Sequence, residues 1–133
     1  MAVTNDYLQW VLEQLSGVGL LTTRRMFGAV GIYRGEVFFA IISSDVLYFK
    51  VGDANRADYE RRGARQFHPY RDRPQLSMNY YEVPADILED PEECALWAER
   101  AIAAAVAKAA AMTKKAAPRR RLAAQPTARG RRR

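Results

Sequence analysis

The last 26 residues of the chain contain no acid and almost nothing that could enter a hydrophobic core. Ten of the 21 Lys/Arg residues fall within residues 108–133, which gives this segment a net charge of +10. Residues 1–107 carry eleven Lys/Arg against fifteen Asp/Glu, a net charge of −4. Because a segment poor in apolar side chains cannot bury enough surface to fold alone, we expect one folded domain over residues 1–112 and a disordered basic tail over 113–133.

Composition excludes several classes of protein. No apolar run approaches the roughly 18 residues that span a membrane, and residues 1–6 lack the features of a secretory signal. The single cysteine, Cys94, excludes an internal disulfide, and with His68 as the only histidine we expect no Cys/His zinc site. These features favour a cytoplasmic protein with no metal, no cofactor and no membrane partner.

Residue periodicity predicts an α+β fold. Apolar residues at helical spacing predict a helix over residues 5–16, capped by Thr4 or Asn5 and followed by Gly17 in the left-handed conformation. Segments rich in β-branched and aromatic residues predict strands over residues 20–23, 29–33, 36–42, 46–50 and 76–80. Their short connections predict a two-layer fold, in which helices cover one face of a mainly antiparallel sheet of four to five strands.

Turn residues mark the boundaries of these segments. Arg34-Gly35 predicts a tight hairpin turn with a positive φ at Gly35. Asp53 predicts the cap of a short helix over residues 54–62, which Gly63 ends.

The clearest helix start lies at Asp90-Pro91. Asp90 is the expected cap, Pro91 the first helical residue and Glu93 the acid of a capping box. We expect this helix to end near Met112. Its expected buried stripe consists of Cys94, Trp97, Ala101, Ala104 and Ala105.

Several short blocks resemble the N-terminal domain of the TfoX/Sxy family. In chain order they are TRRMFG (23–28), GIY (31–33), LYFKV (47–51), NR (55–56), MNYYEVP (78–84) and the closing Trp97. The resemblance covers roughly residues 5–107. It implies an α+β domain of a competence and transcription regulator that has no enzymatic activity and acts beside a cyclic-AMP receptor protein-type regulator or the RNA polymerase machinery. Family regulators carry a second, helical C-terminal domain. Because this sequence has the basic tail in that place, we expect a stand-alone version of the N-terminal domain.

The basic tail predicts contact with nucleic acid. Spaced cations on a flexible segment can follow a phosphate backbone and release counterions without reading the base sequence. Two alternatives remain open: another anionic partner, such as lipid, and a solubilising tail without a ligand. The absence of a bulky apolar face argues against lipid. The candidate residues are Lys108, Lys114, Lys115, Arg119, Arg120, Arg121, Arg129, Arg131, Arg132 and Arg133.

Arg24, Arg25 and Phe27 are the candidate residues for binding a protein partner. Two adjacent arginines next to an aromatic residue can present a cationic patch to a phosphate or to an acidic surface. The alternative is structural, with Met26 and Phe27 in the core and Gly28 permitting a bend or bulge.

Aromatic residues on the predicted strands have two interpretations. They form either a base-stacking platform on the sheet or part of the core, and the core is favoured because Lys50 is the only basic residue among those strands. The residues concerned are Phe38, Phe39, Tyr48, Phe49, Tyr80 and Tyr81.

No pattern in the sequence predicts catalysis. His68 has no serine, cysteine or acid beside it, and the serines lack a Gly-x-Ser-x-Gly motif. The chain is therefore predicted to be a non-enzymatic regulatory or adaptor protein that binds a protein through its body and nucleic acid through its tail. The alternatives are a nucleoid-associated or RNA-binding protein acting through the tail, and a small-ligand binder or enzyme with a pocket near Arg24, Arg25 and Tyr80.

Overall fold

The computed structural model describes residues 3–26, 28–68 and 79–124, with side chains as far as Ala111. Four consecutive strands and one later strand form an antiparallel sheet, with the helices before and after them, which confirms the predicted α+β fold class. The elements are α1 (Asn5–Gln14), the 3₁₀ turn η1 (Ser16–Val18), β1 (Thr22–Met26), β2 (Ala29–Arg34), β3 (Val37–Ser43), β4 (Val46–Lys50), α2 (Arg56–Glu60), β5 (Tyr80–Glu82), α3 (Ala85–Leu88) and α4 (Pro91–Ala124).

The five strands form one antiparallel meander in the order β1-β2-β3-β4-β5. Gly35 has φ 62° in the turn between β2 and β3, as predicted. The next turn is made by Ser44 and Asp45, both with positive φ, a combination that suits the twist of a two-residue hairpin. β1 continues to Met26 rather than ending near residue 23, because its last residues pair with the start of β2.

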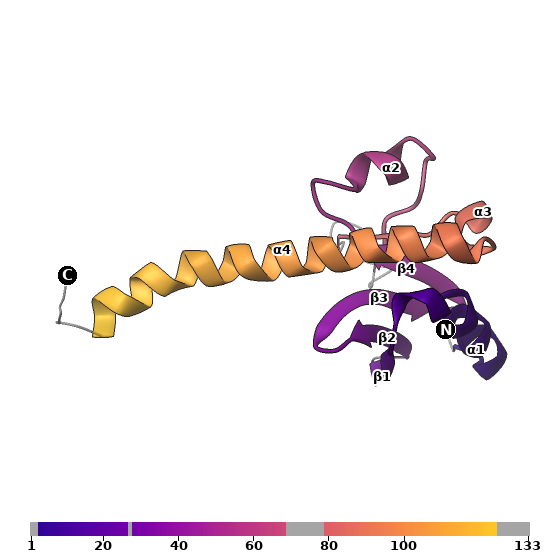
Figure 1. Cartoon of the computed structure of the whole chain (residues 1–133), viewed down its shortest axis with the longest axis horizontal. Coiled ribbons are helices and arrows are strands. Elements are labelled where there is room, and N and C mark those ends of the chain that lie inside the picture. Colours follow the sequence, from indigo (N-terminus) through magenta and orange to yellow (C-terminus); the bar gives the residue numbers. More distant parts are fainter. Residues whose placement is uncertain (1–2, 27, 69–78, 125–133) are drawn as a thin grey trace.

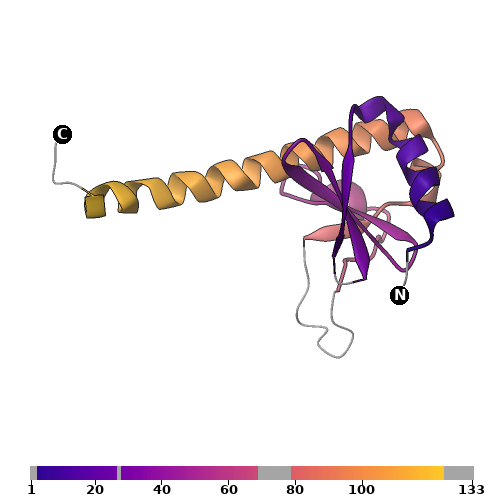
Figure 2. The same cartoon turned by 90° about the horizontal axis from the view of Figure 1, so that it is seen from below.

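One hydrophobic core lies between the sheet and the helices. Val30, Ile32, Ala40, Ile42 and Leu47 point from one face of the sheet into this core. α4 crosses that face against β3 and β4, and α1 joins it through η1 and the start of α4 (Figures 1 and 2). The predicted two-layer arrangement, with helices over one face, is therefore present.

α1 begins as predicted but ends differently. The Thr4 hydroxyl oxygen accepts a hydrogen bond from the Tyr7 N–H at 3.2 Å, which confirms the cap. Gly17 does not have a positive φ; it lies inside η1, and Gly19 takes the positive φ of 111°. The chain tightens into a 3₁₀ turn that buries Val18 before it reverses toward β1.

The cap predicted for the short helix is wrong. Asn55, not Asp53, is the N-cap residue of α2, and the Asp53 side chain lies fully in solvent. Asn55 is 3% exposed because its amide fastens the loop that leads into α2. Gly63 has φ 65°, as expected of a residue that ends a helix.

β5 lies on the outer side of β4 and is short. Tyr80 pairs with Lys50, and Glu82 pairs with Tyr48. The sequence predicts this strand over residues 76–80, of which 76–78 lie outside the described residues. Gln66 bridges to Tyr81 on the open side of β5, so a loop covers this sheet edge.

α4 begins where the sequence predicts and continues much further. The Asp90 carboxylate accepts hydrogen bonds from the N–H groups of Glu92 and Glu93, at 3.1 and 3.3 Å. The helix passes Met112, its predicted end, and reaches Ala124, because alanine, lysine and arginine favour helix without any packing partner. Residues 125–133 of the predicted tail lie outside the described residues. The buried stripe is Cys94, Trp97, Ala98, Ala101 and Ile102.

Candidate functional site

The face of the sheet away from the core carries a row of aromatic rings. The Tyr33 and Phe38 rings stack with their centroids 4.9 Å apart, and the Phe38 and Tyr80 rings are tilted at 5.6 Å. Gly31 makes room for this row, since a Cβ there would stand 2.9 Å from the Phe38 ring. By contrast, Phe39 and Phe49 lie in the core. Phe39 and Phe49 therefore belong to the core, whereas Phe38 and Tyr80 lie on the other face of the sheet.

A cation lies at each end of this row. The Arg24 guanidinium carbon is 5.5 Å from the centroid of the Tyr33 ring, and the Lys50 Nζ is 5.0 Å from that of the Tyr80 ring. Burial raises the pKa of the Tyr80 hydroxyl, so this ring stays neutral and presents its face to Lys50. The arrangement suits a ligand with negative charge and a flat apolar part.

A groove of about 560 Å³ opens at the Tyr80 end of the row. It forms at the corner where β3 begins, β4 ends and β5 begins, beneath the part of α4 that leaves the sheet. Small alanine side chains on α4 keep the space open. Its walls include Phe38, Lys50 and Tyr80 from the sheet, and Ala105, Lys108 and Ala109 from α4.

Two lysines meet across this groove. Lys50 and Lys108 both line the groove, close enough for the positive charge of Lys108 to act on Lys50. Partial burial lowers the pKa of the Lys50 ammonium, and the positive charge of Lys108 lowers it further. Among the residues described, neither lysine has a carboxylate within ion-pair distance.

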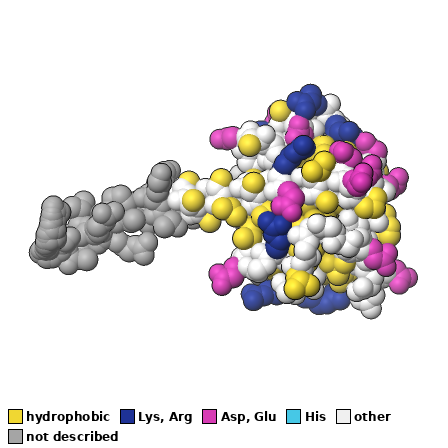
Figure 3. Space-filling view, in the orientation of Figure 1, with side chains coloured by type: hydrophobic (Ala, Val, Ile, Leu, Met, Phe, Trp, Pro, Cys, Tyr) yellow, Lys and Arg dark blue, Asp and Glu magenta, His cyan; other side chains and the backbone are white. Residues whose placement is uncertain are grey.

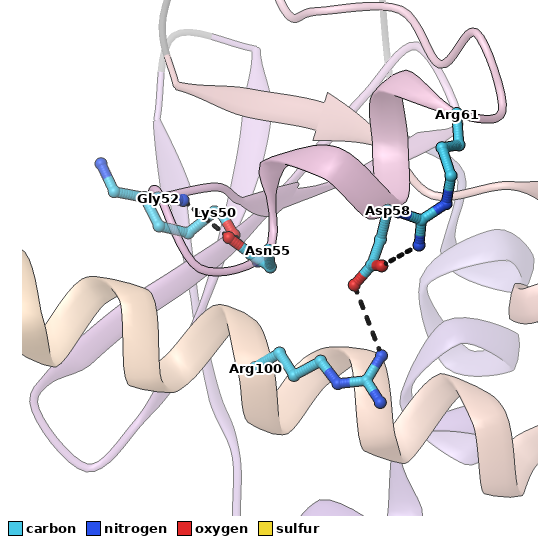
Figure 4. A network of polar contacts seen from close by, with 6 residues as sticks. All are labelled: Lys50, Gly52, Asn55, Asp58, Arg61 and Arg100. Carbon is cyan, nitrogen blue, oxygen red and sulfur yellow. Dashed lines mark hydrogen bonds and ion pairs between the residues drawn. The ribbon is translucent and has the colours of Figure 1, made fainter.

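A polar network fixes the end of β4 beside this groove (Figure 4). The Gly52 N–H donates to the Asn55 Oδ1 at 2.7 Å, and the Asn55 Nδ2 donates to the Lys50 carbonyl at 3.1 Å. On the next turn, the Asp58 carboxylate accepts from Arg61 at 2.6 Å and pairs with Arg100 of α4 at 3.6 Å. The backbone of Lys50 is thereby held in place by α2, and α2 is tied to α4.

The candidate partner-binding residues are only partly visible. Arg24 and Arg25 are exposed on β1, the strand at the sheet edge, and Phe27 lies outside the described residues. Met26 is half-buried and contributes to the packing around Gly31. Gly28 has φ 79°, consistent with the predicted bend. Among the described residues, the structure places Arg24, but not Arg25, against an aromatic ring.

The candidate nucleic-acid residues extend along α4. Lys108 is exposed and lines the groove. Five more lie within the helix, beyond the part with described side chains: Lys114, Lys115, Arg119, Arg120 and Arg121. The remaining four lie outside the described residues: Arg129, Arg131, Arg132 and Arg133.

The single cysteine and the single histidine lie in opposite environments. Cys94 is completely buried, and burial followed by the nearby Asp90 carboxylate raises the pKa of its thiol to about 12. His68 is exposed. Within residues 3–26, 28–68 and 79–111, no three acidic, histidine or cysteine side chains converge as a metal site would require. In the same part of the chain, no helix is long and apolar enough to cross a membrane.

The fold is an α+β domain built on a five-stranded antiparallel meander with helices over one face. The family described as TfoX N-terminal domain matches residues 13–105, and the chain belongs to this family. One curated relative is the DNA transformation protein TfoX1 of Aliivibrio fischeri, 26% identical over 83 residues. That match covers 57% of this chain and 40% of the relative, so the chain spans less than half of the relative's length.

Proposed function

We propose that this protein is a non-enzymatic regulatory adaptor, in which the folded body binds a protein partner and the basic end of α4 contacts nucleic acid. The proposal rests on membership of the TfoX N-terminal domain family and on the name of the relative, which refers to DNA transformation. The partner we propose is a transcription component, either a cyclic-AMP receptor protein-type regulator or the RNA polymerase machinery.

The course of α4 is the observation that carries the nucleic-acid part. The last buried side chain of its inner face is Ile102, and from Val106 onward all the described side chains are exposed. Residues 106–124, which we name the arm, project past the sheet as helix (Figure 1). At 1.5 Å per residue the arm is about 28 Å long. It therefore carries basic residues away from a body whose net charge is negative.

The surface of the arm supports a role in charge attraction rather than packing. Its described part, residues 106–111, consists of four alanines, Val106 and Lys108, and the face seen in Figure 3 is mostly hydrophobic where the helix leaves the body. Alanines bury little area, so they provide a helix without a strong apolar docking face. The nucleic-acid contact we propose is consequently electrostatic and independent of base sequence.

Binding to a short fluorescent DNA duplex, followed by anisotropy across about 50–200 mM salt, tests this role. With about six phosphates neutralised, the slope of log K against log salt should be about −5. Replacing Lys114, Lys115, Arg119, Arg120 and Arg121 with glutamine should remove most of that slope. Equal affinity and slope in this variant would refute the proposal.

A matched body variant separates the arm from the rest of the surface. The double variant Arg24→Gln/Arg25→Gln removes two exposed charges from β1. It should change the slope of log K against log salt by less than the arm variant does. Equal loss of binding on neutralising β1 would place the nucleic-acid contact on the sheet edge instead. Pull-down with nuclease treatment then identifies the protein partner of the body.

A further inference from the structure

The groove between α4 and the sheet has the composition of a ligand site rather than of a packing defect. Its volume of about 560 Å³ lies within the range of about 300–1,000 Å³ typical of small-molecule sites. Phe38, Ala105 and Ala109 supply apolar walls, and two lysines supply charge. Such a combination of apolar surface with a few converging polar groups is what small-molecule recognition requires.

The charges of the groove are unbalanced. Lys50 reaches in from β4 and Lys108 from α4, so each wall contributes one ammonium group. Glu36 is the only acid in the lining and makes no ion pair with either lysine among the described residues. Two like charges held at close range repel each other, and an anion between them would relieve that repulsion.

We propose that this groove binds a small organic anion whose phosphate or carboxylate group sits between Lys50 and Lys108. The apolar part of the ligand lies along Phe38 and the alanines of α4, beside the face of Tyr80. This proposal is independent of the nucleic-acid proposal, because the site requires neither DNA nor the part of the arm beyond Ala110.

The order of the elements explains why both walls are needed. Tyr80 and Lys50 form a cross-strand pair, so the sheet presents an aromatic ring and a cation together. α4 lies close to this corner, since a Cβ on Gly52 would stand 3.2 Å from the Cβ of Ala104. One turn later the helix clears the sheet and brings Lys108 over the groove. A ligand bridging the two lysines would fasten α4 to the end of β4.

Titration of the full chain with phenyl phosphate, followed by amide and lysine NMR, tests the proposal. We expect saturable binding with shifts at Lys50, Tyr80 and Lys108. Benzoate and inorganic phosphate serve as comparison ligands, the first to distinguish carboxylate from phosphate and the second to test the apolar wall. Phenyl phosphate should bind at least about tenfold more tightly than inorganic phosphate, a difference of one decade in affinity.

Variants assign the binding to this groove. Lys50→Met and Lys108→Met each remove one ammonium while retaining a long side chain, and each should weaken phenyl phosphate binding by about tenfold. Ala109→Leu should block the apolar wall, since this exposed residue can be enlarged without entering the core. Arg62→Met, which removes a charge outside the lining and outside the polar network of Figure 4, should leave the affinity unchanged.

The titration of Lys50 gives a readout independent of affinity. Its pKa should rise when the ligand binds and also in Lys108→Met, because both changes remove the unfavourable influence of a neighbouring positive charge. Binding that survives both lysine substitutions, or phenyl phosphate binding no tighter than that of inorganic phosphate, would overturn the proposal. Either result would leave the DNA measurements unaffected.

Discussion

The rings of Tyr59 and Trp97 meet edge to face, with their centroids 4.9 Å apart and their planes at 76°. Tyr59 comes from α2 and Trp97 from the second turn of α4, so this contact joins the short helix to the long one. Tyr81 of β5 lies on another side of Tyr59, at 5.8 Å between ring centroids. The Tyr59 ring is therefore the point at which three elements meet, and it is 1% exposed.

Truncation of this contact should destabilise the domain strongly. Tyr59→Ala or Trp97→Ala removes a buried aromatic side chain and should lower the free energy of unfolding by about 3–5 kcal/mol. Tyr59→Phe should act in the opposite direction. The Tyr59 hydroxyl is buried without a hydrogen-bond partner among the described residues, so its removal should stabilise by about 1 kcal/mol. Urea unfolding of the three variants measures these differences, and a destabilised Tyr59→Phe would show that the hydroxyl has a partner.

Asn55 should be the most sensitive polar residue of the domain. Asn55→Ala removes the acceptor of the Gly52 N–H and the donor to the Lys50 carbonyl, at a cost of about 2–4 kcal/mol. Asp53→Ala is the matched control, since the Asp53 side chain is fully exposed and should contribute little. Thermal unfolding compares the two. Similar losses in both would mean that Asp53 does cap α2.

Gly31 should not tolerate a larger residue. In Gly31→Ala the new Cβ would lie 2.8 Å from the end of Met26 and 2.9 Å from the Phe38 ring. Displacing these groups should cost about 1–3 kcal/mol. Gly17→Ala is the control, because its nearest neighbour is Ala95 at an ordinary 3.7 Å. Urea unfolding and the ring-current shifts of Tyr33 report the two effects, and equal stability of both variants would argue against the close packing at Gly31.

Local chemistry explains why the body of the fold was predictable. Gly35 and Asp90 each dictate a boundary through their own backbone or side chain, and both act as predicted. Asp53 and Asn55 are both residue types that cap helices. Asn55 takes the N-cap position without a side-chain capping bond, because its amide binds the Gly52 N–H and the Lys50 carbonyl instead. The predicted end of α4 near Met112 is wrong because an alanine-rich helix can continue without burial, so the loss of apolar residues there does not stop it.

The groove was much less predictable than the strands. Alternation along β4 places Leu47 and Phe49 in the core and thus Lys50 on the opposite face. Nothing in that pattern indicates that Lys108, 58 residues later, returns to the same corner. The alternative prediction of a pocket near Arg24, Arg25 and Tyr80 differs from this groove, which Tyr80 lines together with Lys50 and Lys108. The proximity of Lys50 and Lys108 depends on the angle at which α4 crosses the sheet, which local sequence patterns do not specify.

Stability should fall at alkaline pH as Tyr7 titrates. Burial raises the pKa of the Tyr7 hydroxyl to about 12 from an ordinary 10.0, against a hydrogen bond from the Leu47 backbone that lowers it. Because the folded protein holds this proton more tightly, the contribution is fully present below pH 10 and is lost between about pH 10 and 12. Urea midpoints across this range should decline less steeply in Tyr7→Phe than in the wild type. Identical slopes would assign the decline to other groups.

The Cys94 thiol should be inert in the folded protein. It is completely buried between α4 and the core, and its pKa is raised to about 12, mainly by that burial. Since the thiolate is the reactive species, a disulfide reagent should modify Cys94 only when the domain opens. The modification rate should therefore rise with urea in parallel with unfolding.

Two substitutions at Cys94 test how closely the core packs around this side chain. Cys94→Ala leaves a small cavity, whereas Cys94→Ser places a hydroxyl, which is more polar than the thiol, inside the hydrophobic core. The serine variant should therefore be less stable than the alanine variant, by about 1–3 kcal/mol. A serine variant as stable as the wild type, or rapid modification of the native thiol at neutral pH, would mean that water reaches Cys94 in the folded state. The first turns of α4 would then be accessible to reagents in the folded protein.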